Sequence, residues 1–294
     1  GVNLGPDGLG VYRAGQDTAI KTSGAGALRF TLPPPTHAGA NIAGVWQPVS
    51  TSGTPLALGG RKFVEGDTFY LQFRMRLSPE MLNNTWDSSW KFFIVGYNNS
   101  SLCGTLALVN INYYMAGFPA GYTECGGRGN YANLDGTWNP NPPTYLQQGD
   151  YPCAYGQGSG TYPNPPCFRF VSNEWMTFYW KITVGTWTQA NSKIESWVAK
   201  DSAPVMRKWQ SITNYIFNVN DVNTWGFNNA TFLPYMTGLS STSGLAGVTS
   251  YMWFDEFIVS TQPIAAPGAI STTPLPGDLN GDRIINSIDF SIMN

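Results

Sequence analysis

Residues Thr68 to Leu77 alternate strictly between apolar and polar side chains, and this pattern constrains the fold more than any other in the chain. Within Phe69–Leu77 every odd position is apolar, and the even positions are Tyr70, Gln72, Arg74 and Arg76. A period of two residues places the apolar set on one face of a β-strand. The segment therefore predicts a strand with one face in a core and one polar face.

Other segments of similar character recur along the chain and are separated by turn-forming residues. They are Ala27–Leu32, Lys91–Tyr97, Leu106–Tyr114, Trp175–Val184, Ile194–Ala199 and Tyr251–Ser260. The 33 glycines and 21 prolines leave little room for long helices, and residues 116–170 read as one long loop region. Several short alternating strands of this kind predict an all-β fold, an antiparallel β-sandwich or jelly roll.

The charge balance excludes two classes of protein. Lys and Arg number 16 and Asp and Glu number 18, which gives a net charge of -2. A nucleic-acid binder or a polybasic membrane-surface protein normally carries a basic excess. No apolar run approaches the roughly 20 residues of a membrane helix. We therefore expect neither nucleic-acid binding nor membrane insertion.

The four cysteines, Cys103, Cys125, Cys153 and Cys167, indicate an oxidising compartment. They lack the Cys-x-x-Cys spacing that a zinc site favours. Pairing of nearest neighbours would close two loops within the Gly/Pro-rich region, and four buried free thiols are the alternative. Disulfides suit a chain so rich in loops and poor in charge. Gly1 starts directly in a polar segment, as a mature secreted chain would.

The composition changes after the last predicted strand, and a motif for calcium follows. We expect a sandwich domain at residues 1–262, a Pro/Thr-rich linker at 263–276 and a short tail at 277–294. The tail offers oxygen ligands at positions 1, 3, 5, 7, 9 and 12 of a loop: Asp278, Asn280, Asp282, Ile284 through its carbonyl, Asn286 and Asp289. Calcium takes six to eight oxygens from such offsets, so the tail predicts a structural calcium site. An Asp/Asn-rich surface turn is the alternative.

This tail resembles the first repeat of a dockerin, the module that docks enzymes to cohesins. The resemblance implies a cohesin as a partner. Dockerins carry two such repeats, and one is present here before the chain stops at Asn294.

The segment Tyr251–Ser260 resembles the closing strand of concanavalin A-like lectin and glucanase sandwiches. Phe69–Leu77 and Trp90–Tyr97 resemble strands of the jelly-roll polysaccharide lyases of that superfamily. The resemblance covers most of residues 60–260. It implies a secreted carbohydrate-active protein that acts on or binds an extracellular polysaccharide.

A lyase must neutralise a uronate carboxylate and remove the C5 proton with a base. On the polar faces of the predicted strands, nine residues are candidates: Gln72, Arg74, Arg76, Lys91, Asn110, Asn112, Tyr114, Tyr179 and Lys181. Arg74 with Asn110 or Gln72 would neutralise the carboxylate, and Tyr114 or Tyr179 would be the base. Lys91 or Lys181 would lower the pKa of the tyrosine. The alternative is an ordinary solvated face.

A glycoside hydrolase is a weaker interpretation. The Glu-x-Asp-x-x-Glu motif of related glucanases is missing, and the neighbours Asp255 and Glu256 should point to opposite faces of a strand. Asp255 would instead bind a structural calcium with oxygens of the N-terminal loop, or accept hydrogen bonds in a turn. The competing functions are a non-catalytic glycan-binding module and a structural or surface-assembly protein.

Overall fold

The alternating segment forms the central strand β3, Thr68–Leu77, of the larger of two sheets. Its odd residues, from Phe69 to Leu77, are each at most 1% exposed and form the middle of the core. The computed structural model describes residues 14–32, 61–83, 90–96, 106–110, 119–123, 168–187, 189–215, 217, 226–236 and 249–265. The alternation therefore predicts correctly which face of this strand is buried.

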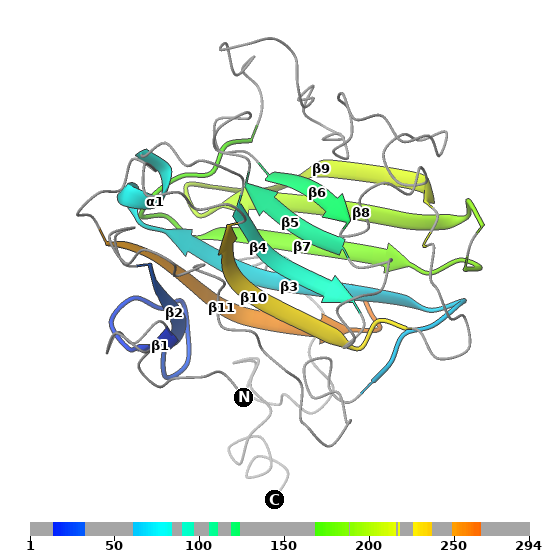
Figure 1. The fold of residues 1–294 in the computed structure, drawn as a ribbon, viewed down its shortest axis with the longest axis horizontal. Coiled ribbons are helices and arrows are strands. Elements are labelled where there is room, and N and C mark those ends of the chain that lie inside the picture. The colour runs from blue at the N-terminus through cyan, green and yellow to red at the C-terminus, as the bar shows by residue number, and fades with distance from the viewer. Residues whose placement is uncertain are drawn as a thin grey trace, which may run out of the picture. The chain divides into compact units, whose positions relative to one another are not determined.

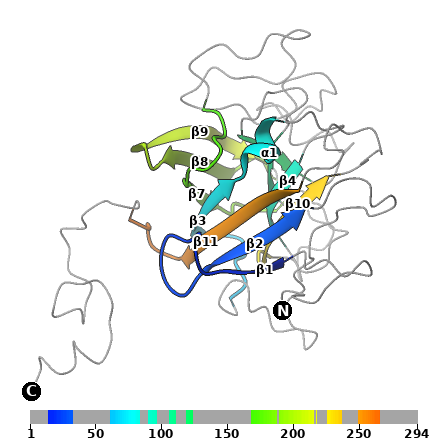
Figure 2. The same cartoon turned by 90° about the vertical axis from the view of Figure 1, so that its left-hand side faces the viewer.

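Seven strands form the larger sheet, which we call the wide sheet (Figure 1). Their order is β1-β2-β11-β3-β7-β8-β9, and Figure 2 shows them side by side. The strands that flank β3 are β1 (Ala14–Asp17), β2 (Ala27–Leu32), β7 (Met176–Thr183), β8 (Ser192–Lys200), β9 (Ala203–Tyr215) and β11 (Ser250–Ser260). All neighbouring strands run antiparallel.

Four strands form the second sheet, which we call the narrow sheet and which lies in front of the wide sheet in Figure 1. The order is β10-β4-β5-β6, with β4 at Trp90–Gly96, β5 at Leu106–Asn110, β6 at Pro119–Thr123 and β10 at Asn229–Met236. These pairs are also antiparallel. One short helix, α1 at Pro79–Asn83, follows β3.

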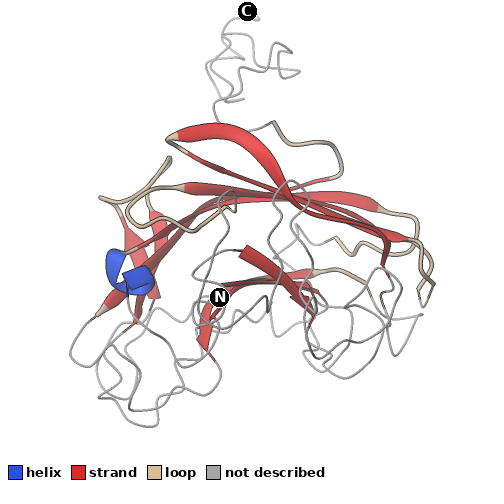
Figure 3. Ribbon diagram, turned by 90° about the horizontal axis from the view of Figure 1, so that it is seen from above, coloured by secondary structure: helices blue, strands red, loops and turns tan. Residues whose placement is uncertain are grey.

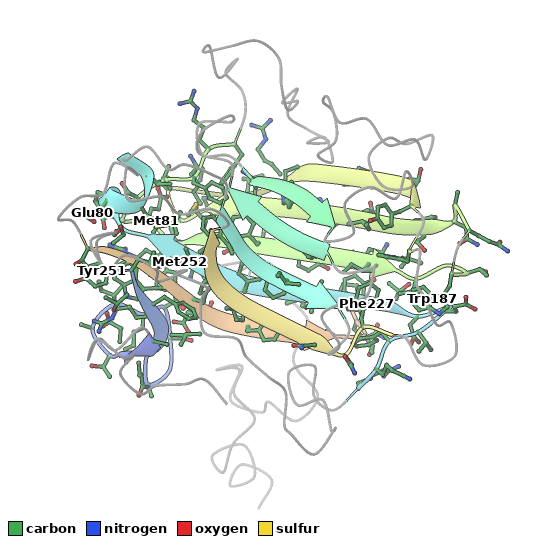
Figure 4. All side chains as sticks on the ribbon, viewed as in Figure 1. Glu80, Met81, Trp187, Phe227, Tyr251 and Met252 are labelled. Carbon is green, nitrogen blue, oxygen red and sulfur yellow. The ribbon has the colours of Figure 1, made fainter. Side chains whose placement is uncertain are left out.

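Aromatic side chains fill the space between the two sheets. The ring of Phe73 on β3 lies 4.7 Å from Phe93 on β4, 5.3 Å from Phe232 on β10 and 5.4 Å from Phe178 on β7. In Figure 3 the wide sheet arches over the narrow one, so these rings lie under the arch. Figure 4 marks Trp187 and Phe227, with ring centroids 6.4 Å apart, at one end of this core, and Met81 and Met252 at the other.

The prediction of an all-β antiparallel sandwich is confirmed. β4, β7, β8 and β11 fall within two residues of their expected bounds. β5 is described over Leu106–Asn110, and the rest of the expected strand, up to Tyr114, lies outside the described residues. Four strands have no counterpart among the predicted segments: β1, β6, which lies within residues 116–170 that were expected to form a loop, and the two long strands β9 and β10. Both contain register shifts that break the period of two residues, and β10 also contains Pro234.

By its internal contacts the chain divides into the units Gly1–Ile264 and Ala265–Asn294. Every strand described above belongs to the first unit. Among the described residues, no helix is long and apolar enough to cross a membrane.

Candidate functional site

Five candidate residues lie together on one surface, the face of the wide sheet that points away from the core. We call it the outer face. It carries the even positions of β3 and the odd positions of β7: Gln72, Arg74, Arg76, Tyr179 and Lys181. Gln72 is paired directly with Tyr179, and Tyr70 with Lys181. The sequence therefore predicts correctly that these five residues share a face.

Gln72 is not accessible on the outer face. Only 3% of the residue is exposed, and its Oε1 lies buried with no hydrogen-bond partner in the part of the chain that the structure describes. The ring of Tyr179, its direct neighbour, contacts Tyr70 at 6.1 Å and Trp197 at 5.4 Å. A buried amide of this kind cannot reach a polymer, so a substrate-binding role for Gln72 is not supported by its position.

The guanidinium of Arg74 is already neutralised within the protein. It forms ion pairs with Asp201 and, at 3.8 Å, with Glu256, and its side chain is 11% exposed. It also lies over the ring of Trp175 at 5.9 Å. A uronate carboxylate would have to displace two protein carboxylates to pair with this cation.

Glu256 reaches Arg74 because β11 is irregular at this point. The register of β11 against β3 shifts between Asp255 and Ile258, and Glu256 has a φ of 48°. A bulge of this kind re-aims side chains. The expectation that Asp255 and Glu256 point to opposite faces is therefore wrong: Asp255 is paired with Arg74 in the register, and Glu256 forms an ion pair with the same residue.

Lys181 also has a carboxylate partner. Its Nζ lies 3.6 Å from Glu195 on β8, and Lys208 on β9 donates to the same carboxylate at 2.8 Å. Burial raises the pKa of Glu195, but the hydrogen bond from Lys208 and the two positive charges outweigh it, so the pKa is lowered overall. Arg76 donates to Asn173 Oδ1 at 3.5 Å.

Tyr179 is poorly suited to act as a base. Burial raises the pKa of its phenol above 10.0, and although a backbone hydrogen bond from Ile264 lowers it, Tyr70 and Glu195 raise it further. Lys181 was expected to lower this pKa, but its positive charge is paired with Glu195, so the negative charge beside Tyr179 acts in the opposite direction. A phenolate at Tyr179 is therefore disfavoured.

The loop between β1 and β2 contacts the outer face near β11. Asp255 Oδ2 accepts hydrogen bonds of 2.7 Å from the backbone N–H and the hydroxyl of Thr22, and its Oδ1 accepts one of 2.9 Å from the N–H of Glu256. Asp17 similarly accepts a hydrogen bond of 2.9 Å from the indole of Trp253. Of the two roles considered for Asp255, these donors support the hydrogen-bond role. No cluster of three metal-ligating side chains occurs among the described residues.

Asp255 and Asp17 should make the stability of the protein depend on pH in the acid range. Burial raises the pKa of each carboxyl, but their hydrogen-bond donors outweigh it, so both pKa values lie below 3.8. Because the pKa is lower in the folded state, the stabilisation is complete above about pH 4 and is lost as the pH falls through the folded value.

We expect Asp255→Asn to lower the free energy of unfolding by about 1 kcal/mol at neutral pH. Because the variant lacks this titrating group, its stability should fall less steeply than that of the wild type between about pH 5 and pH 2. Urea unfolding at several pH values measures both effects. Parallel stability curves for the two proteins would contradict the role of this carboxylate.

Two further candidates belong to the narrow sheet, so the nine residues do not share one sheet. Lys91 on β4 is paired with Val109 on β5 and with Tyr235 on β10. Asn110 is paired with Trp90 and with Pro119. Adjacent positions of β5 alternate between faces, so the positions of Lys91 and Asn110 lie on opposite faces of this sheet. The pairing between Lys91 and Tyr235 could not be predicted from the sequence.

The remaining predicted residues lie outside the described part of the chain. They are Asn112, Tyr114, the cysteines Cys103, Cys125, Cys153 and Cys167, and the tail positions Asp278, Asn280, Asp282, Ile284, Asn286 and Asp289. Their assigned roles stay predictions.

Several solved structures share this fold at low sequence identity. The marine PL-14 alginate lyase from Aplysia kurodai is 14% identical, with a TM-score of 0.53 over 85% of this chain and 87% of that chain. An endo-β-1,4-glucuronan lyase from the fungus Trichoderma reesei is 14% identical, with a TM-score of 0.45 over 85% and 87%. The family 7 alginate lyase A1-II′ is 11% identical, with a TM-score of 0.43 over 86% of both chains.

No protein-family model matches the chain, and no curated protein matches it. The similarity to the Aplysia lyase shows that the chain has a lyase-like jelly-roll fold.

Proposed function

We propose that this protein is a carbohydrate-active protein, a polysaccharide lyase that cleaves an acidic extracellular polysaccharide by β-elimination. The observation that carries the proposal is the fold shared with the Aplysia alginate lyase over 85% of the chain. Fold alone does not fix function, so the proposal also depends on where the chain can offer a cation to a uronate.

The narrow sheet is the better place for the substrate. On the outer face of the wide sheet, Arg74 and Lys181 are paired with protein carboxylates and Gln72 is buried. Lys91 is the second residue of β4, an inner strand of the narrow sheet that lies between β10 and β5. We therefore assign the site to the face of the narrow sheet opposite the core, around Lys91.

The reaction needs a cation and a proton carrier, and no co-substrate. A cation beside the C6 carboxylate makes the C5 proton more acidic, a base removes that proton, and the C4–O4 bond breaks as the C4=C5 double bond forms. The leaving oxygen takes up a proton. Lys91 supplies the cation, and a tyrosine is the proton carrier; Tyr114, which the sequence predicts as a candidate base, lies outside the described residues.

The proposal also gives a role to the C-terminal tail. A calcium loop at Asp278–Asp289 would fix the C-terminus and could present it to a cohesin or to another subunit. Secretion would place the enzyme with its polymer and would allow the four cysteines to pair.

The test of lyase activity is a panel of polyuronates that includes alginate, glucuronan and pectate. We expect the full chain to release unsaturated ends, detected as rising ultraviolet absorbance, from at least one of them. A neutral glucan is the matched control, because it has no carboxylate to neutralise. If ultraviolet absorbance does not rise on any of the polyuronates, the lyase proposal is refuted. Binding on a glycan array without turnover would instead identify a non-catalytic module.

A further inference from the structure

The narrow sheet contains a bulge at Phe92 that fixes the face on which Lys91 lies. Lys91 is paired with Val109 and Phe93 with Leu108, so Phe92 is an extra residue relative to β5. Phe92 and Phe93 are both fully buried: Phe93 packs on Phe73, and Phe92 contacts Phe170 at 5.4 Å. Two successive buried residues on one side are what such an insertion produces.

The register of the neighbouring strands agrees with this placement. Val109 directly follows Leu108, the partner of Phe93, so its position lies on the face opposite the core. A register shift separates Tyr235 from Phe232, so the face of Tyr235 follows from its partner: directly paired positions of neighbouring strands lie on the same face. Since Lys91 is paired with both Val109 and Tyr235, all three positions share the face opposite the core.

The bulge has a clear chemical consequence. In a regular strand, residues two apart share a face, so the position of Lys91 would lie on the core face beside Phe93. An ammonium group is very costly there unless it is paired. The bulge therefore moves the position of Lys91 to the face of the narrow sheet opposite the core.

Pro234 maintains the register on the other side of the pair. It has no backbone N–H, and prolines within sheets are confined to edge strands and bulges. In β10, an edge strand, it lies inside the register shift between Phe232 and Tyr235. The shift brings Tyr235, rather than its neighbours, opposite Lys91.

We propose that Tyr235 is the proton-transfer residue of the lyase reaction and that Lys91 is its partner, an assignment that rests on the function proposed above. Directly opposed residues of an antiparallel pair have Cβ atoms about 4.5–5.5 Å apart, close enough to act on one sugar. A neighbouring ammonium favours the phenolate of a tyrosine. The phenolate removes the C5 proton and returns it to O4 as the C4–O4 bond breaks, so the proton balance closes within one residue.

The decisive variant is Tyr235→Phe, assayed on a polyuronate that the wild type cleaves. We expect kcat to fall by at least about a hundredfold while KM changes less than about threefold, because the ring is kept and only the acid–base group is removed. Tyr179→Phe on the outer face is the matched control and should keep the wild-type kcat. Circular dichroism and thermal unfolding verify that both variants fold.

The outcomes separate the two proposals. If the wild type is active and Tyr235→Phe keeps its kcat, the role of Tyr235 is refuted while the lyase function stands. If the wild type cleaves no polyuronate, both proposals fail.

A measurement without substrate tests the pairing itself. A short dinitrobenzene cross-linker that joins an amine to a phenol should link the peptides that contain Lys91 and Tyr235, as detected by mass spectrometry. The link should be lost in Tyr235→Phe and kept in Tyr179→Phe. Its absence from the wild type would contradict the proposed juxtaposition.

Discussion

Lys91→Ala is expected to lower kcat/KM for polyuronate cleavage by at least about a hundredfold. Groups that neutralise charge or transfer protons at a reacting centre typically contribute factors of this size. On the wide sheet, Arg74 and Lys181 are paired with Glu256, Asp201 and Glu195. Arg76 donates to Asn173 there. Initial rates of absorbance increase over a range of polymer concentrations measure the effect.

Lys181→Ala is the matched control for this prediction. It removes the same side chain from the other sheet, where its Nζ lies 3.6 Å from Glu195. Its kcat/KM should stay within about twofold of the wild type, since exposed ion pairs contribute at most about 1 kcal/mol to stability. Should Lys181→Ala abolish activity and Lys91→Ala preserve it, the site would belong to the outer face of the wide sheet.

Phe73→Ala is expected to cost about 3–5 kcal/mol of unfolding free energy. Phe73 is 1% exposed, and its ring contacts rings from both sheets: Phe93, Phe178, Phe232 and Phe254, at 4.7 to 6.1 Å. Truncation leaves a cavity where the two sheets meet, and stiff aromatic neighbours fill it poorly. Guanidinium unfolding, with midpoint and slope compared, measures the loss.

Two further variants serve as controls for the stability loss expected of Phe73→Ala. Phe73→Leu keeps most of the volume and should cost clearly less than the alanine variant. Val205→Ala, at a β9 position that is 76% exposed, should change stability by less than about 0.5 kcal/mol. A loss below about 1 kcal/mol for Phe73→Ala would mean that the two sheets are not packed through this ring.

The fold could be predicted wherever side chains alternate without interruption. β3 and β7 follow the period of two residues, and their buried faces match the prediction. β9 and β10 were missed because bulges shift the alternation, as between Phe232 and Tyr235. The sequence also could not show which predicted strand joins which sheet, so Lys91 and Arg74 were expected on one surface.

The candidate site was harder to predict because it depends on contacts between distant residues. The partner of Arg74, Asp201, is 127 residues away in the chain, and nothing in the alternation of β3 signals that pair. Glu256 reaches Arg74 only because of a bulge with positive φ. Pro234 was the one readable sign of irregularity near Lys91, but its meaning depends on the register of β10.

The order of strands in the wide sheet determines when this chain can fold. The last strand, β11, is inserted between β2 and β3, so both early strands lack an edge partner until Ser250–Ser260 has been made. Contacts of such long sequence separation fold slowly. A ribosome-bound chain that ends before β11 therefore presents two open strand edges, which makes holdase chaperones or rapid completion of synthesis important for a productive yield.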